Sequence, residues 1–151
     1  MTVHNAPEIR KLTRKECDTI LRRNHVGRMA YTLRNRVDIR PLHYVASRGW
    51  LFGRTSHGDK LSTLQHSQWV VFEVDEVAST FDWQSVLVRG TFYRLEPGGA
   101  APDARLYRRA LRALRSVAPD TLTAHDPVPF RSEIFGISMN EVTGRASSTP
   151  A

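Results

Sequence analysis

Five strand-like segments between His25 and Glu96 constrain the fold more than any other feature of this chain. Each is rich in β-branched and aromatic residues, which suit a pleated, half-buried surface. The turn sequences Arg34-Asn35-Arg36 and Ser47-Arg48-Gly49 are short, and such turns join antiparallel neighbours. We therefore expect a mainly antiparallel sheet. Its segments are Val26–Leu33, Val37–Val45, Trp50–Arg54, Trp69–Glu76 and Trp83–Leu95.

A first helix is expected to begin at Thr13. Thr13 can cap the helix, because Glu16 stands at the reciprocal position of a capping box. Leu12 and Cys17 have the spacing of a hydrophobic staple, so Cys17 is expected to pack rather than react. A second, amphipathic helix is predicted over Asp103–Val117, where apolar residues recur with helical spacing.

A short helix over residues 58–67 and a last strand over Arg131–Val142 complete the predicted elements. Strands that do not alternate regularly with helices predict an α+β protein, an antiparallel barrel with flanking helices. At 151 residues the chain has the length of one domain. We expect a flexible arm over residues 1–11, the domain over 12–145 and a disordered tail over 146–151.

The charge is strongly positive and is carried by arginine. There are 22 basic residues, mostly Arg, and the formal net charge is +7, which favours anionic ligands. Arginines on the predicted second helix are typical of a solvated outer face, and no base-reading motif accompanies them, which argues against a nucleic-acid partner.

With one cysteine, no signal-peptide core and no apolar run of about 18 residues, the chain is expected to be cytoplasmic and not membrane-bound.

Metal and nucleophile motifs do not occur in the sequence. The six histidines show neither the HExxH pattern nor a helical i,i+4 pair, so no metal site is expected. No GxSxG elbow or activated thiol supports nucleophilic catalysis.

A polar cluster after the third strand-like segment has the composition of a phosphate site. Arg54 supplies a fork of donors, Thr55 and Ser56 supply hydroxyls, Gly58 permits close backbone approach, and Lys60 adds a point charge. Neither GxxxxGK[ST] nor GxGxxG occurs, so a phosphate would be held differently from a Walker or dinucleotide loop. A solvated turn leading into a helix would use the same residue types.

A second feature favours a phosphate site over a solvated turn. It is Trp83-Gln84-Ser85, at the start of a strand that ends in Gly90. An aromatic ring and two polar side chains together with a phosphate cluster suit a flat aromatic ligand with a phosphate tail.

With these motifs the chain resembles the pyridoxamine 5'-phosphate oxidase-like flavin-binding split-barrel superfamily, within it the nitroimidazole-resistance-like branch. Each matching piece is degenerate, but their order is specific. The resemblance implies a six-stranded split barrel that forms a homodimer and binds two flavin mononucleotides (FMN) where the subunits meet. The matching pieces are the first helix, HVGRMA from His25, RPLHYV from Arg40, RTSHGDKL from Arg54, Val70–Val74, WQSVLVRG from Trp83 and EVTGR from Glu141.

The resemblance also implies a set of site residues. The phosphate would be held by Arg54, Thr55, Ser56 and Lys60, and the backbone from Pro41 through Leu42 and His43 to Tyr44 would lie along the isoalloxazine ring. Ser85 would lie near the flavin, and Trp83 would wall the ring or its mouth, from the same or the partner subunit. No catalytic side chain is implied, because the flavin supplies the redox chemistry.

Two departures from the superfamily pattern narrow the expected function. The chain ends without the arginine- and histidine-containing segment that binds vitamin B6 phosphate, so oxidation of that vitamin is not expected. Gly53 replaces a usual aromatic or histidine and either enlarges the pocket or relieves crowding.

We expect an FMN-binding oxidoreductase that reduces a small organic acceptor, such as a nitroaromatic, with NAD(P)H. An F420-dependent reductase and a non-enzymatic flavin carrier or redox sensor are the alternatives; no histidine stands out as a haem ligand.

Overall fold

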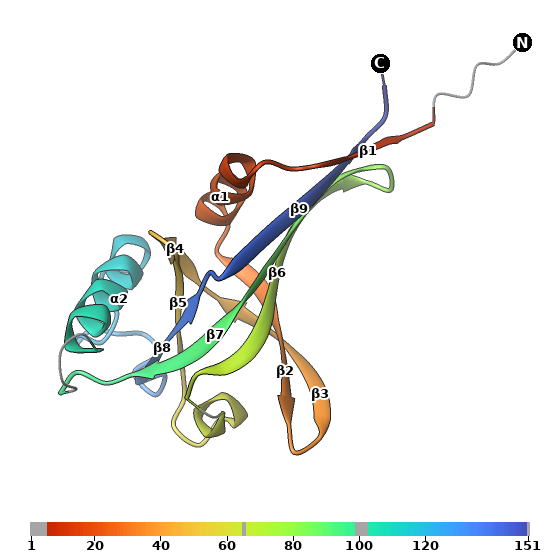
Figure 1. The fold of residues 1–151 in the computed structure, drawn as a ribbon. Helices are drawn as coiled ribbons and strands as arrows, with labels where there is room; N and C mark the ends of the chain where they lie inside the picture. Colours follow the sequence, from red (N-terminus) through yellow and green to blue (C-terminus); the bar gives the residue numbers. More distant parts are fainter. Residues whose placement is uncertain (1–5, 65, 99–102, 151) are drawn as a thin grey trace, which may run out of the picture.

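The computed structural model describes residues 6–64, 66–98 and 103–150. Its strands form one nine-stranded sheet with helices packed on it (Figure 1). This confirms the α+β class and the mainly antiparallel sheet. In chain order the elements are β1 (Glu8–Lys11), α1 (Arg14–Arg23), β2 (Val26–Leu33), β3 (Arg36–His43), β4 (Val45–Ser47), β5 (Trp50–Thr55), the 3₁₀ helix η1 (Lys60–Thr63), β6 (Gln68–Ser79), β7 (Asp82–Leu95), α2 (Asp103–Val117), β8 (Glu133–Ser138) and β9 (Glu141–Ser148).

Neighbouring strands run in the order β3-β2-β6-β7-β8-β5-β4, and every pairing is antiparallel. The predicted tight turn joins β2 to β3, with Arg34 and Asn35 both at positive φ, 53° and 62°. That backbone matches the right-handed twist of a hairpin. The sheet order ends with β3 on one side and β4 on the other, so the described sheet is not closed.

The strand count exceeds the expected six by three. β1 and β4 are additional, and the expected last strand is divided into β8 and β9. Met139 donates its backbone N–H to Gly49 O over 2.9 Å at this division, and Asn140 donates to Ser138 O over 3.1 Å. β8 and β9 both run antiparallel to β7, so the strand is interrupted here without reversing direction. Apolar and polar residues alternate as far as Asn140, so periodicity alone did not reveal the interruption.

The two ends of the described chain pair with each other. Glu8–Lys11 lies antiparallel to Arg145–Ser148, and β9 also pairs with β7. Residues 8–11 and 146–148, expected in a flexible arm and a disordered tail, therefore lie in strands. Backbone hydrogen bonding of β1 to β9, and of β9 to β7, stabilises segments whose polar sequence gives no strand signal. Residues 1–5 and 151 of these two segments lie outside the described residues.

The first helix begins where the sequence predicts. Thr13 Oγ1 accepts from Glu16 N over 3.2 Å, and Glu16 Oε1 accepts from Thr13 N over 3.1 Å, which completes the capping box. Cys17, Ile20 and Leu21 are buried on one face of α1. The expected packing role of Cys17 is thereby confirmed.

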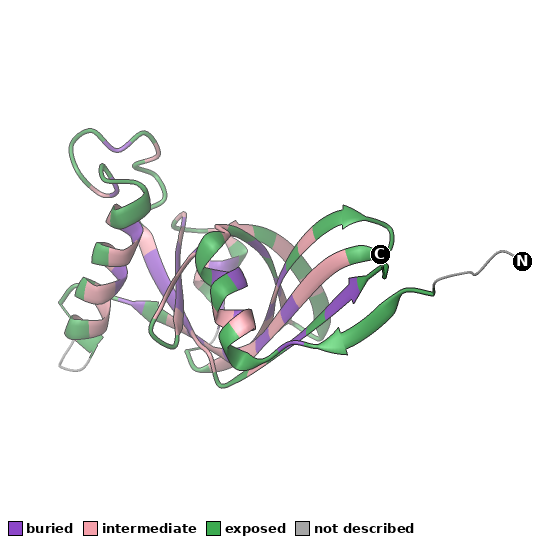
Figure 2. Cartoon of the chain, turned by 90° about the horizontal axis from the view of Figure 1, so that it is seen from above, coloured by how far each residue is buried: buried purple, intermediate pink, exposed green. Residues whose placement is uncertain are grey.

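Two hydrophobic clusters lie on opposite sides of β5. The larger cluster lies on the side of β5 away from α2 and includes Tyr44, Leu51, Phe72 and Phe135. The smaller lies under α2, where Ala110 and Leu114 pack with Phe52, Leu95 and Ile134. Figure 2 shows the buried positions of α2 on the side that faces the strands. Alternate residues of β5 therefore face different environments, and this places Arg54 on the same side as α2.

Candidate functional site

The predicted phosphate loop is held against β3. Arg40 of β3 forms an ion pair with Asp59, and Lys60 Nζ lies 3.7 Å from Asp38 Oδ2 on the same strand. Asp59 also accepts from Leu61 N over 3.0 Å and thereby caps η1. The structure therefore brings the loop beside the strand that was predicted to lie along an aromatic ring.

The ion pair between Arg40 and Asp59 shifts the pKa values of both partners. The Arg40 guanidinium holds the pKa of Asp59 below its usual range, despite partial burial. The same contact raises the pKa of Arg40. Both partners are charged near neutral pH, so the loop is attached to β3 by a full ion pair.

The loop still offers donors to a ligand. Lys60 is 68% exposed at the side chain, and Gly58 adopts φ +83°, a conformation that glycine reaches without strain. Thr55 is buried and Ser56 is partly buried at the end of β5, and neither hydroxyl donates or accepts a hydrogen bond within the described chain. A cation, two hydroxyls and an open backbone turn are a donor set suited to an anion.

Arg54 points to a different segment from Lys60. Its Nη2 donates to Asp126 Oδ2 and to Val128 O, each over 2.7 Å. Only 11% of its side chain and 1% of that of Asp126 are exposed. Arg54 Nε is the one buried side-chain nitrogen or oxygen of the described residues that has no hydrogen-bond partner. The predicted four-residue phosphate cluster is thus divided between two sides of β5.

A small cavity of about 180 Å³ joins Arg54 to the end of β3. His43 is exposed there, whereas Tyr44 is buried and donates its hydroxyl to Leu21 O over 2.7 Å. Burial raises the pKa of Tyr44, so its side chain is a neutral core group. The cavity lining consists of His25, His43, Tyr44, Val45, Arg54, Leu114, Val117, Ala118, Thr121, Val128 and Arg131.

The other members of the predicted ring-bearing strand contribute differently. Pro41 is exposed and Leu42 is partly buried against the interior cluster. The Tyr44 backbone is anchored to His25, because Tyr44 N donates to His25 O over 2.9 Å and Tyr44 O lies 3.2 Å from His25 Nδ1. His25 therefore fixes the place where β3 ends and the sheet opens.

Trp83 and Ser85 line a separate cavity of about 400 Å³ between β1, β7 and β9. Lys11 and Arg145 give this cavity a basic rim. Ser85 Oγ donates to Glu73 Oε2 over 3.3 Å. Burial and the neighbouring Asp75 raise the pKa of Glu73. Within one chain, the structure does not bring Trp83 and Ser85 into the cavity of His43 and Arg54.

An apolar face lies beside the Trp83 cavity. Val37, Ile39 and Trp69 are 79%, 60% and 64% exposed, and an open cavity of about 350 Å³ lies between β2, β3 and β6. The strand register places Val71 opposite Arg89 and Asp75 opposite Ser85, so this face continues along β6 and β7 to the Trp83 cavity. Charged residues, including the pair of Arg28 with Glu73, separate the apolar part of this face from the Trp83 cavity. The exposed apolar residues Val37, Ile39 and Trp69 are a candidate interaction site.

Sequence reasoning missed the residues that position the predicted ones. Asp126, Asp59 and Arg40 act through ion pairs that connect segments far apart in the chain. Asp126 does carry a local signal, since Asp before Pro127 favours a turn in which the carboxylate bonds the backbone two residues on. That bond is present, from Val128 N to Asp126 Oδ1 over 2.9 Å.

The described ranges lack two other kinds of feature. They contain no cluster of three His, Cys, Asp or Glu side chains that could bind a metal ion. None of their helices combines the length and apolar character that a membrane crossing requires.

The described residues thus form an α+β protein with an open antiparallel sheet and separate cavities at Trp83 and at Arg54. The family model for pyridoxamine 5'-phosphate oxidase matches residues 13–146. The chain therefore belongs to the pyridoxamine 5'-phosphate oxidase family, which confirms the predicted superfamily.

Solved structures of several bacterial proteins share this fold. An FAD-binding protein from Mesorhizobium loti is 25% identical with a TM-score of 0.70, covering 93% of this chain and 99% of its own. A candidate pyridoxamine 5'-phosphate oxidase from Corynebacterium glutamicum is 26% identical with a TM-score of 0.66, covering 95% and 100%. A candidate 5-nitroimidazole antibiotic resistance protein from Bacteroides thetaiotaomicron, 14% identical with a TM-score of 0.64, covers 97% and 95% and shows the shared fold.

Proposed function

We propose that this chain is a cytoplasmic, homodimeric, flavin-binding oxidoreductase that binds FMN and reduces a small organic acceptor, such as a nitroaromatic, with a nicotinamide donor. The observation that carries the proposal is that the loop of residues 54–60 is attached to β3 by the ion pair between Arg40 and Asp59. Family membership and the FAD-binding relative at 25% identity support a flavin as the ligand.

The residues present fit the anionic end of a flavin nucleotide. Thr55, Ser56 and Lys60 offer donors on one side of β5, and the unpartnered Nε of Arg54 offers another on the α2 side. A buried donor without a partner costs about 1–3 kcal/mol, which a ligand acceptor would recover. The cavity of about 180 Å³ at Arg54 is smaller than the roughly 300 Å³ of the smallest ordinary ligand sites, so it suits part of a flavin rather than the whole.

A second subunit would complete such a site. The exposed apolar face with Val37, Ile39 and Trp69 is the proposed dimer interface, and a self-complementary two-fold contact is the commonest arrangement of homodimers. Trp83 and Ser85 lie along the same face. In a dimer formed through it, these two residues would approach the partner's β3 rather than their own.

Within this site the chain binds and orients, while the bound flavin would accept a hydride from the donor and pass it to the acceptor. Lys60 and the hydroxyls would fix the phosphate, and the β3 backbone from Pro41 to Tyr44 would set the plane of the ring. His43 is exposed and lines the same cavity as Arg54, and its imidazole N–H would donate to an anion or a ring edge. No catalytic side chain is proposed.

FAD is the second candidate cofactor because the Mesorhizobium loti relative binds it. F420 stays an alternative, since its phosphate would suit the same loop and its anionic tail would suit the surrounding arginines. A carrier or redox sensor would share the binding site but not turnover.

The first experiment is a titration of the purified protein with FMN, FAD, F420 and haem, followed by visible absorption and flavin fluorescence. Saturation at one FMN per subunit supports the proposal, and tighter binding of FAD or F420 changes the cofactor while keeping the site. Reduction of the bound cofactor by NAD(P)H and its re-oxidation by nitroaromatic acceptors then separates an enzyme from a carrier. Binding of none of these cofactors would contradict the proposed function.

A further inference from the structure

The segment between α2 and β8 is organised around Asp126. The Asp126 carboxylate accepts from Leu122 N over 2.7 Å and from Val128 N over 2.9 Å, in addition to Arg54. Leu122 has φ 53°, a left-handed conformation that a bulky residue rarely adopts. The bond from Leu122 N to the carboxylate helps to hold this conformation. Asp126 therefore fixes the backbone on both sides of itself.

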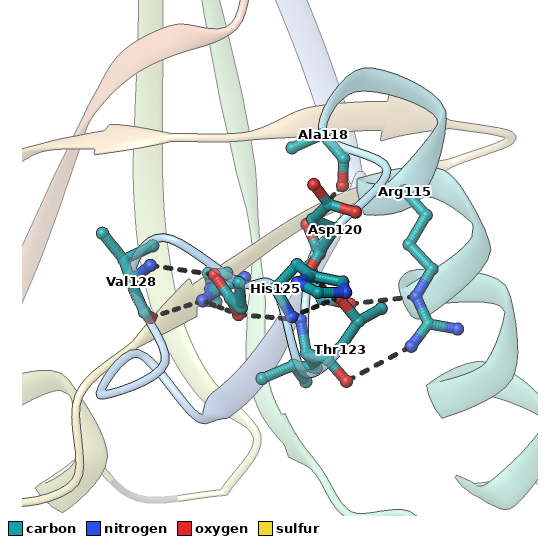
Figure 3. Close-up of polar contacts among 10 residues, drawn as sticks. Arg115, Ala118, Asp120, Thr123, His125 and Val128 are labelled. Carbon is teal, nitrogen blue, oxygen red and sulfur yellow. Dashed lines mark hydrogen bonds and ion pairs between the residues drawn. The ribbon is translucent and has the colours of Figure 1, made fainter.

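Other hydrogen bonds make the segment compact before a ligand binds. Figure 3 shows the contacts that link Arg115 of α2 with residues from Ala118 to Val128. Arg115 Nε donates to Thr121 O over 2.9 Å, and Thr123 Oγ1 donates to Asp120 O over 2.8 Å. Asp126 and Val128, which bind Arg54, thus belong to a segment that is itself held together by hydrogen bonds.

The geometry divides the donors of Arg54 into two groups. Nη2 is occupied by Asp126 and Val128 O, whereas Nε is buried without a partner in a side chain that lines the cavity with His43. Arginine holds an anion best when its planar fork is already oriented. Asp126 and Val128 O thus fix the guanidinium through Nη2, while the buried Nε is left with a donor that a ligand acceptor would satisfy.

We propose that Asp126 is a positioning residue for anion recognition, orienting Arg54 so that its Nε binds the phosphate of the flavin. This inference rests on the proposed function for the identity of the ligand. It assigns a role to a residue of the segment between α2 and β8 that makes no contact with the ligand itself.

The charge of Asp126 and its proposed positioning role predict opposite effects of removing its carboxylate. Asp126→Asn raises the local charge by one unit, so simple attraction would strengthen phosphate binding. If Asp126 positions Arg54, the same variant weakens FMN binding by about ten-fold, roughly the loss of one charge-assisted hydrogen bond. Riboflavin lacks the phosphate, and its affinity stays unchanged.

The test compares FMN and riboflavin affinities, by fluorescence titration, for the wild type, Asp126→Asn and the control Asp120→Asn. Asp120 is an exposed carboxylate of the same segment. Loss of FMN affinity alone, in Asp126→Asn alone, supports the inference. Unchanged or tighter FMN binding contradicts it, and an equal loss for both flavins shows a structural role instead.

A second measurement needs neither flavin nor a substituted Asp126. In ¹⁵N-labelled wild type, the Nε–H resonance of Arg54, assigned with Arg54→Lys, is followed while inorganic phosphate is added. A saturable shift supports an anion site at Arg54 even if no flavin binds, in which case only the proposed function fails. A resonance that does not move up to tens of millimolar phosphate overturns the inference.

Discussion

Gly53 on β5 and Phe135 on β8 are register partners, and the phenyl ring occupies the space that a side chain at Gly53 would need. A Cβ at Gly53 would lie 2.4 Å from Phe135 Cζ and 2.9 Å from His43 O. Gly53 therefore relieves crowding and does not enlarge the ligand pocket. It lets β5 approach the end of β3, where the predicted phosphate loop and the predicted ring-bearing strand meet.

Gly53→Ala is expected to destabilise the fold by about 1–3 kcal/mol, the usual cost of overpacking a core. Urea unfolding followed by circular dichroism measures the change. Gly98→Ala is the matched control, because a Cβ there meets nothing within 4 Å. Adding Phe135→Leu to Gly53→Ala should recover part of the loss, and an additive double variant would show that the ring is not the cause.

Much of the fold follows from local sequence. The capping box at Thr13 and the Arg34-Asn35-Arg36 turn specify the start of α1 and the β2–β3 hairpin through contacts within a few residues. The pairing of β1 with β9 does not follow, because it joins the two ends of the chain. Neither segment carries a strong strand pattern of its own.

The candidate site was predictable in composition but not in geometry. Sequence placed Arg54 with Lys60, yet strand alternation turns Arg54 toward α2 and Asp126, while Lys60 meets β3. Side-chain direction at the end of a strand depends on which face each neighbour covers, and distant segments decide this. Whether Trp83 and Ser85 join the same site depends on a second subunit, which one chain's periodicity cannot specify.

Thr13→Ala is expected to lower the free energy of unfolding by about 1 kcal/mol, the usual value of an N-cap. The hydroxyl satisfies Glu16 N, a donor that α1 itself leaves unpaired. Urea unfolding of this variant and of Lys15→Ala, which changes an exposed position in the same helix, gives the comparison. Equal stability of Thr13→Ala and the wild type would contradict the capping role.

Asp126 is expected to contribute to unfolding in acid. Burial raises its pKa, but the Val128 and Leu122 N–H groups and Arg54 outweigh burial, so its folded pKa lies below the ordinary value. As the pH falls below about 4, the unfolded chain takes up the proton first, and the stability contributed by Asp126 declines through its folded pKa. Stability measured from pH 5 to pH 2 should therefore fall less steeply in Asp126→Asn than in the wild type. Parallel curves would show that the carboxylate is not stabilised by folding.

Trp69→Glu is expected to convert the proposed dimer to a monomer. Trp69 is 64% exposed at the apolar face, and a buried charge without a partner would oppose association there. Sedimentation equilibrium of the wild type and the variant measures the mass. Phe81→Glu is the control, because it also replaces an exposed aromatic residue but lies in the β6–β7 turn. A wild-type monomer, or a Trp69→Glu dimer, would place the interface elsewhere or remove it.

Lys60→Ala is expected to weaken FMN binding by about 1.5 kcal/mol, the lower end for a charged hydrogen bond, because the side chain is 68% exposed and screened by solvent. Riboflavin affinity should not change, since the lost partner is the phosphate. Asp38→Asn tests the same charge from the other side: it removes the carboxylate 3.7 Å from Lys60 Nζ and should leave FMN binding equal or tighter. Weaker FMN binding in Asp38→Asn would mean that Asp38 holds Lys60 in its binding position. Equal FMN affinity of Lys60→Ala and the wild type would move the phosphate away from this loop and leave Arg54 as the remaining candidate anchor.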